Sequence, residues 1–181
     1  AGCIFPVGLM MIVFVGGELF TGDCMMSMAW MQRKIHFADM LRTLVLVYVS
    51  NFVGAALIAF LVAHSGQYDY SSGALGAYTI KVAYGKVHLS FANALISGIL
   101  CNILVCVAVL MAAAAKDIAG KVLAIFFPIL AFVVSGFEHC VANMYYIPAG
   151  IFASKNAAYA AKALELYNID STQLSSLNWG S

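Results

Sequence analysis

The most informative part of the sequence is Ser135-Gly136-Phe137-Glu138-His139-Cys140-Val141-Ala142-Asn143-Met144, which lies inside an apolar run from about residue 122 to 153. A run of this length is long enough to cross a bilayer as a helix. Ionisable side chains inside a membrane are costly and usually functional. We therefore predict a membrane-spanning segment that is interrupted at residues 138–143, at a functional site.

A similar interruption occurs near the N-terminus, where Gly17-Glu18-Leu19-Phe20-Thr21-Gly22-Asp23-Cys24-Met25 breaks the apolar run from about residue 3 to 31 at residues 18–23. In both stretches a Gly precedes a Glu, and an Asp or Asn follows five residues after the Glu. Two complete spans separate the stretches, so the broken segments would cross in opposite directions, as an inverted repeat requires. Paired broken helices of this kind indicate a transport site near the membrane midplane. The alternative is a pair of kinks whose polar groups are satisfied within the protein.

The composition excludes a soluble protein. Of the 181 residues, 64% are hydrophobic and 9% are charged, against roughly 45–50% and 25% in ordinary globular chains. The net charge is +1, so no basic surface large enough for nucleic acid is expected. The five cysteines are odd in number and form no C-x-x-C pair, so we expect neither a disulfide framework nor a metal centre, and no cofactor. The predicted fold class is an all-α membrane protein.

The apolar runs divide the chain into a membrane region, residues 1–154, and a polar tail, residues 155–181. Between the two broken spans we predict unbroken spans at about 41–63 and 91–115. Residues 67–85 are rich in Gly and Ser and are predicted to form a loop. Residues 157–166 of the tail are predicted to form a short amphipathic helix, or part of a loop, outside the membrane.

The distribution of Lys and Arg predicts the orientation in the membrane. The two short connections, after the first and third spans, hold a higher density of positive charge than the long connection and the tail. The short connections hold Arg33, Lys34, Arg42, Lys116 and Lys121, and the longer stretches hold Lys81, Lys86, Lys155 and Lys162. We therefore place the short connections in the cytoplasm.

His139 is the leading candidate for a functional role, because an arriving anion would stabilise its imidazolium form. It could then attract the anion, share a proton with it, or release it as the neutral acid. Thr21 offers a hydroxyl that can donate to an anion and accept from His139 if the two breaks face each other. The buried amide of Asn102 either joins helices or lines the path. Glu18 and Glu138 would repel an anion, so we expect them to point away and to accept hydrogen bonds from backbone N–H groups of the breaks.

Each of these residues also has a plain structural interpretation. His139 could be a hydrogen-bonded core histidine, and Thr21 could bond its own helix backbone. Lys86, before the third span, either concentrates anions at the entrance or is simply solvated. Asn51 is typical of helix packing. The methionines at positions 25, 26, 28 and 31 are better explained by packing than by a copper path, because no second thioether cluster repeats them.

Three motifs resemble signatures of the formate/nitrite transporter family. They are Glu18-Leu19-Phe20-Thr21-Gly22, Leu100-Cys101-Asn102-Ile103-Leu104-Val105-Cys106 and the stretch from Ser135 to Met144 quoted above. The resemblance implies an aquaporin-like helical bundle and a ring of five protomers, each with its own pore. It also implies a protomer of six helices, of which this chain matches the second to fifth and lacks the first and last.

The resemblance further implies roles for individual residues. Two apolar constrictions would flank a central chamber, and polar side chains would line the path between them. The outer constriction would hold Phe5, Leu9 and Phe132, and the inner one Leu19, Phe20 and Val105. The path would hold Thr21, Asn102 and His139, with Lys86 in the outer funnel and Glu18, Glu138 and Asn143 supporting the breaks. Cys140 replaces a Ser that the family often has there, and Ser50-Asn51 replaces Gly-Asn.

The leading hypothesis is a multi-pass channel of the inner (plasma) membrane for small monovalent anions, namely formate, nitrite or hydrosulfide, and not an enzyme. Passage could be linked to a proton through His139. A channel for water or a small polyol is the alternative, although the aquaporin Asn-Pro-Ala motif is missing. A membrane scaffold or redox subunit is a third, and the single histidine within the spans argues against haem.

Overall fold

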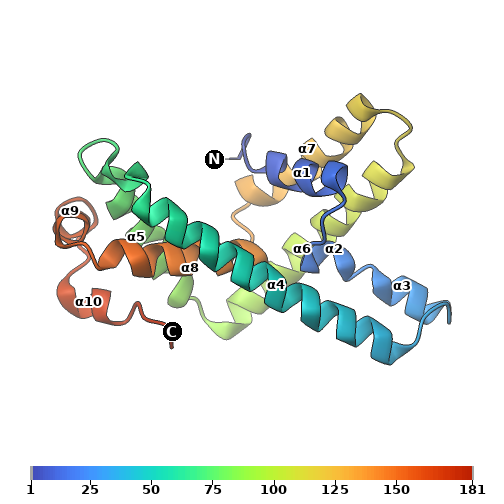
Figure 1. Ribbon diagram of the computed structural model, residues 1–181, viewed down its shortest axis with the longest axis horizontal. Helices are drawn as coiled ribbons and strands as arrows, with labels where there is room; N and C mark the ends of the chain where they lie inside the picture. The colour runs from blue at the N-terminus through green and yellow to red at the C-terminus, as the bar shows by residue number, and fades with distance from the viewer. Residues whose placement is uncertain (1, 181) are drawn as a thin grey trace. The chain divides into compact units, whose positions relative to one another are not determined.

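The computed structural model describes residues 2–180, and this part of the chain is built of helices and their connections, with no strand (Figure 1). The all-α fold is therefore confirmed. In chain order the elements are α1 (Pro6–Val15), α2 (Phe20–Asp23), α3 (Met26–Met31), α4 (Phe37–His64), the 3-10 helix η1 (Gln67–Asp69), α5 (Ala74–Val87), α6 (Phe91–Ala114), α7 (Ile118–Val134), α8 (Cys140–Ser154), α9 (Ala157–Tyr167) and α10 (Ser171–Ser175).

The helices form two compact units. The first comprises residues 1–51 and 92–140, and the second comprises residues 52–91 and 141–181. In the first unit α1 lies along α7, as Figure 1 shows. The core of this unit is apolar and joins α1, α6 and α7 through Leu9, Cys101, Val105, Ile125, Ile129 and Phe132.

The long apolar helices are the candidate membrane-spanning segments of the chain. Within the described residues, α4 and α6 are long and apolar enough to cross a membrane, and α1 with the segment Phe20–Met31 forms a further candidate span that bends by 68°. Many large apolar side chains on α4 are exposed, among them Val45, Val53 and Leu57. Such a surface is stable only against lipid or other protein. The fourth predicted span corresponds to α7 and α8 and stays a prediction.

A glycine in the left-handed region ends the helix before each break. Gly16 has φ 76° after α1, and Gly136 has φ 72° after α7. The next residue closes the turn in both cases: the N–H of Gly17 bonds to the carbonyl of Ile12, and that of Phe137 to the carbonyl of Phe132. Glycine adopts this conformation without the steric cost that a Cβ would bring.

The breaks lie a few residues earlier than the sequence predicted. Non-helical backbone occupies residues 16–19 and 135–139, whereas the predicted interruptions were 18–23 and 138–143. Asp23 and Asn143 are helical. The prediction placed each break at its polar residues, but the left-handed glycine is what stops the helix, and the polar residues that follow join the next one.

The second unit corrects another prediction. Residues 67–85 are not a loop, since η1 and most of α5 occupy them. The helix is favoured by its buried face, where Ala77, Ile80 and Ala83 recur at helical spacing. This face packs against α9, which lies beside α5 in Figure 1. For that segment the sequence had left open a short amphipathic helix or part of a loop. The hydroxyl of Tyr159 on α9 donates a 2.6 Å hydrogen bond to Asp69.

Candidate functional site

The two breaks meet through a hydrogen bond. Thr21 lies in the first turn of α2, immediately after the first break, and His139 is the last residue of the second break. Thr21 Oγ1 is 3.0 Å from His139 Nε2, and both side chains are buried, at 5% and 8% exposure. Residues 118 apart in sequence therefore share one polar contact. This is the contact that the sequence analysis expected if the breaks faced each other.

Aromatic rings hold the imidazole of His139 on another side. The ring of Phe132 stacks on it with 5.8 Å between centroids, and the ring of Phe5 meets it edge-on at 6.3 Å. The two phenylalanines also contact each other at 5.4 Å. Leu9 belongs to the same apolar cluster as Phe132. Of the three residues predicted for the outer constriction, Phe5 and Phe132 thus lie beside His139, and Leu9 belongs to the apolar cluster that they contact.

Each break is held by a polar side chain from an unbroken helix. Asn51 on α4 accepts a hydrogen bond from the N–H of Phe20 at 3.0 Å and donates to the carbonyl of Glu18 at 3.2 Å. Ser97 on α6 accepts from the N–H of Glu138 at 2.9 Å. These bonds satisfy backbone groups that the breaks leave without helical partners.

Sequence reasoning missed this role for Asn51 and did not single out Ser97. The cap at the first break is Asn51 rather than Glu18, whose side chain is exposed. The available signal was the presence of a lone amide within an apolar span, because such a group needs a partner. Nothing in the sequence distinguished Ser97 from a serine that bonds its own helix.

A groove of about 640 Å³ runs past the Thr21–His139 contact. Its walls come from α2, α6 and the second break, and most lining residues are apolar or cysteine. The amide oxygen of Asn102 is buried there and has no hydrogen-bond partner within residues 2–180. The polar residues and cysteines of the lining are Thr21, Cys24, Cys101, Asn102, Cys106, Glu138, His139 and Cys140. A buried amide oxygen without a partner, in the same lining as a hydroxyl and an imidazole, belongs to a set of groups able to bind a small polar solute.

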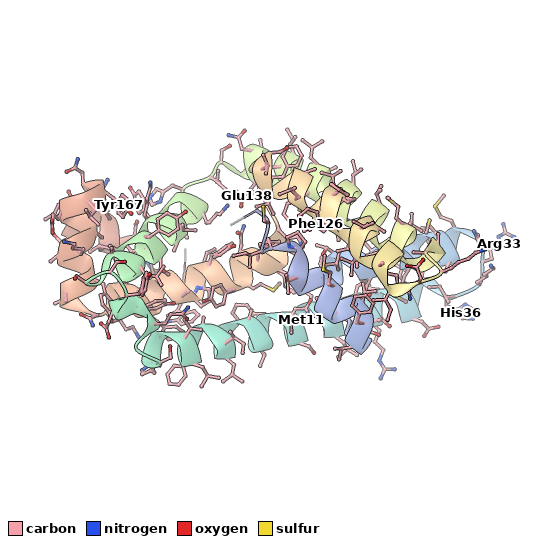
Figure 2. All side chains as sticks on the ribbon, turned by 90° about the horizontal axis from the view of Figure 1, so that it is seen from above. Met11, Arg33, His36, Phe126, Glu138 and Tyr167 are labelled. Atoms are coloured by element: carbon pink, nitrogen blue, oxygen red, sulfur yellow. The ribbon has the colours of Figure 1, made fainter. Side chains whose placement is uncertain are left out.

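The residues predicted for the inner constriction lie in the same unit. Val105 is buried in the apolar core, and Leu19 packs against that core. Phe20 lines the groove and contacts Tyr48 at 5.1 Å between ring centroids. Glu138 also borders the groove, and Figure 2 shows it at the break that follows α7.

The structure assigns two predicted residues to the second unit. Lys86 lies in the last turn of α5, and Asn143 lies in the first turn of α8. The site described above is built within the first unit alone. Roles for Lys86 and Asn143 at the path stay predictions.

Helices with an exposed apolar surface, and two breaks that meet at a buried polar contact, define a helical membrane protein. The chain belongs to the formate/nitrite transporter family, whose model, described as "Formate/nitrite transporter", matches residues 1–175. The predicted family membership is thus confirmed.

Relatives and a solved structure agree with this assignment. The chain is 46% identical to an uncharacterized transporter, YrhG, of Bacillus subtilis over 151 residues, covering 83% of this chain and 56% of the relative. It is 45% identical to the formate channel BtFdhC of Bacillus thuringiensis over 153 residues, covering 84% and 58%. A solved pentameric formate channel with formate bound superposes with a TM-score of 0.80 at 29% identity, covering 98% of this chain and 72% of that structure. The chain spans little more than half the length of these curated relatives.

Proposed function

We propose that the chain forms the pore region of a membrane channel for small monovalent anions, with formate as the first candidate and nitrite and hydrosulfide as the others. The observation that carries this proposal is the buried Thr21–His139 hydrogen bond at the edge of the groove. The similarity to the formate channel of Bacillus thuringiensis supports formate.

The direction of the Thr21–His139 bond links anion binding to the proton. When Nε2 carries a proton, it donates to Thr21 Oγ1, and the threonine hydroxyl is left to donate to an anion. When Nε2 is unprotonated, it accepts from the hydroxyl, which then turns away from the anion. Protonation of His139 and anion binding at Thr21 therefore support each other.

The apolar flanks explain why a proton would assist passage. An anion must shed water to pass side chains such as Phe5, Phe132 and Val105, and an unpaired charge in such surroundings is costly. The neutral acid crosses the same region at a much lower cost. In this mechanism His139 gives a proton to the anion within the groove and regains one afterwards.

The proposal extends to the membrane location, the oligomeric state and the orientation of the protein. We place the protein in the plasma membrane as a homo-pentamer, in line with its similarity to the solved pentameric formate channel. The connections around Arg33 and Lys116 face the cytoplasm, and the tail from residue 155 lies on the other side. Exposed apolar side chains on α4 and α6 then contact lipid or neighbouring protomers.

The test is an anion-flux panel on the full-length protein in liposomes at pH 5 and pH 8. Formate, nitrite and hydrosulfide are supplied separately, and His139→Phe is compared with the wild type. We expect wild-type formate flux to rise toward pH 5, and His139→Phe to lose most of this pH dependence. His64→Phe is the matched control, because that imidazole is exposed and bonds the carbonyl of Phe60 in its own helix.

The outcomes separate the alternatives. An unchanged pH profile in His139→Phe would remove the histidine from the mechanism. Osmotic swelling in water or a polyol, without flux of any of the three anions, would favour a channel for neutral solutes.

A further inference from the structure

The turn between α3 and α4 forms a small pocket in the first unit, separate from the groove at His139. Its volume is about 270 Å³. The lining combines cationic, aromatic and aliphatic side chains, namely Trp30, Arg33, Lys34, Ile35, His36 and Phe37. Figure 2 labels Arg33 and His36 on this turn. Nothing in the proposed passage of anions uses this pocket.

The backbone of the turn places two cations next to each other. The N–H of Lys34 bonds to the carbonyl of Ala29 at 2.9 Å, and that of Arg33 bonds to Trp30 at 2.8 Å. This is the pairing of a Schellman motif, in which glycine is the usual left-handed residue. Arg33 adopts φ 58° there instead, where the Cβ of an L residue lies close to the following carbonyl oxygen. The strained position is occupied by a permanent positive charge.

The positive charge of the pocket is not neutralised within the described chain. Arg33 and Lys34 are exposed, and neither forms a salt bridge or side-chain hydrogen bond with any of residues 2–180. No acidic residue is among the described lining. Asp39, in the first turn of α4, pairs with neither cation. The pocket therefore offers free donors to an external anion.

The aromatic side of the pocket indicates which anion fits. The rings of Trp30 and Phe37 lie 5.4 Å apart and are 42% and 52% exposed. Tryptophan beside the end of an apolar helix is typical of the membrane–water interface. Phe37 begins α4, which is long and apolar enough to span the membrane. An anion with an attached acyl chain would use both halves of this surface, whereas free phosphate would use only the cations.

We propose that this pocket binds the phosphate headgroup of an anionic phospholipid. Arg33 and Lys34 contact the phosphate oxygens, and Trp30 and Phe37 contact the glycerol and upper acyl chain. Juxtamembrane basic residues attract anionic lipids, roughly fivefold for each charge, and the aromatic rings beside them favour a lipid over a free anion. This site does not depend on which solute the protein conducts.

The experiment uses Trp30 as the reporter. In the full-length protein every other tryptophan, Trp179 among them, is replaced by Phe, and the protein is reconstituted with brominated lipids that quench nearby tryptophan. We expect brominated phosphatidylglycerol, at a small mole fraction in phosphatidylcholine, to quench Trp30 far above its bulk fraction. The double variant R33Q/K34Q should lower this preference about 25-fold, because each of the two charges contributes roughly fivefold and the two factors multiply.

The matched control is K116Q/K121Q, which removes one charge from the other short connection and one from the first turn of α7, and leaves the pocket intact. Preferential quenching that survives this control but not R33Q/K34Q supports the site. Equal loss in both variants would overturn it, because general surface charge would then suffice. Equal quenching by brominated phosphatidylcholine would also overturn it. Displacement of the lipid by millimolar inorganic phosphate would assign the pocket to free phosphate instead.

Discussion

The hydroxyl of Thr21 is the smallest group on which the proposed passage depends. It is buried, it bonds His139 Nε2 at 3.0 Å, and it lines the groove. Thr21→Val keeps the shape of the side chain and removes only this hydroxyl. We expect a loss of formate flux of about tenfold, because a hydrogen bond to a charged group contributes roughly 1.5–3 kcal/mol. Flux in proteoliposomes measures it.

Thr79→Val provides the control for this substitution. Thr79 is also partly buried in a helix, but its hydroxyl bonds the carbonyl of Leu75 in its own helix and lines no part of the groove. Its flux should remain close to that of the wild type. Equal losses in the two variants would mean that Thr21 acts through folding rather than through contact with the anion.

The stability of the protein also depends on the two side chains that cap the breaks, Asn51 and Ser97. Asn51→Ala removes two hydrogen bonds at the first break, and Ser97→Ala removes one at the second. Each leaves a backbone group without its partner, which costs roughly 1–3 kcal/mol where the group is buried. We expect thermal unfolding in detergent to begin at lower temperature for both, with the larger shift for Asn51→Ala.

Ser154→Ala distinguishes the caps from an ordinary helical serine. Its hydroxyl bonds the carbonyl of Ile151 in the same helix, and that carbonyl loses little when the hydroxyl is removed. A shift for Ser154→Ala as large as that for Ser97→Ala would contradict the capping role.

At the scale of elements, the sequence predicted which helices break but not where each break begins. The motif around Glu138 and His139 was visible because ionisable residues are rare in apolar runs. The helix ends because Gly136 adopts φ 72°. The sequence alone does not show whether a glycine within a helical pattern adopts this left-handed conformation. The long unbroken spans could be predicted well, since length and apolarity alone determine them. Asn51 and Ser97 could not be assigned, because their partners are set by tertiary contact.

In the second unit, the sequence predicted a loop where the structure has a helix. The Gly and Ser content of residues 67–85 favoured a loop, yet α5 forms because its apolar face packs on α9. Tertiary burial outweighs the helix propensity of a few glycines, each of which costs only about 1 kcal/mol. The periodic residues Ala77, Ile80 and Ala83 held the signal that should have decided for a helix.

Close approach of α5 and α8 gives a prediction for these elements. A Cβ on Gly150 would lie 2.1 Å from the Cβ of Ala83, which is impossible without separating the helices. We expect Gly150→Ala to destabilise the protein by about 1–3 kcal/mol, the usual cost of overpacking. Gly85→Ala, on α5 itself, is the control, since its added Cβ meets nothing within 4 Å among the described residues. It should be neutral or stabilising, and thermal unfolding in detergent compares the two.

At the scale of the whole molecule, the distribution of positive charge predicts the orientation that the structure alone does not assign. The short connections that contain Gln32 and Lys116 should face the cytoplasm, and the tail that contains Ser175 should face the opposite side. All three side chains are exposed, so each can be replaced by Cys without disturbing the core. In a full-length variant without native cysteines, we expect a membrane-impermeant maleimide added to intact cells to label Ser175→Cys. Gln32→Cys and Lys116→Cys should be labelled only after the cells are opened. Labelling of Gln32→Cys and Ser175→Cys from the same side would mean that the chain does not cross the membrane in the proposed order, and the two broken segments could not then form an inverted pair around His139.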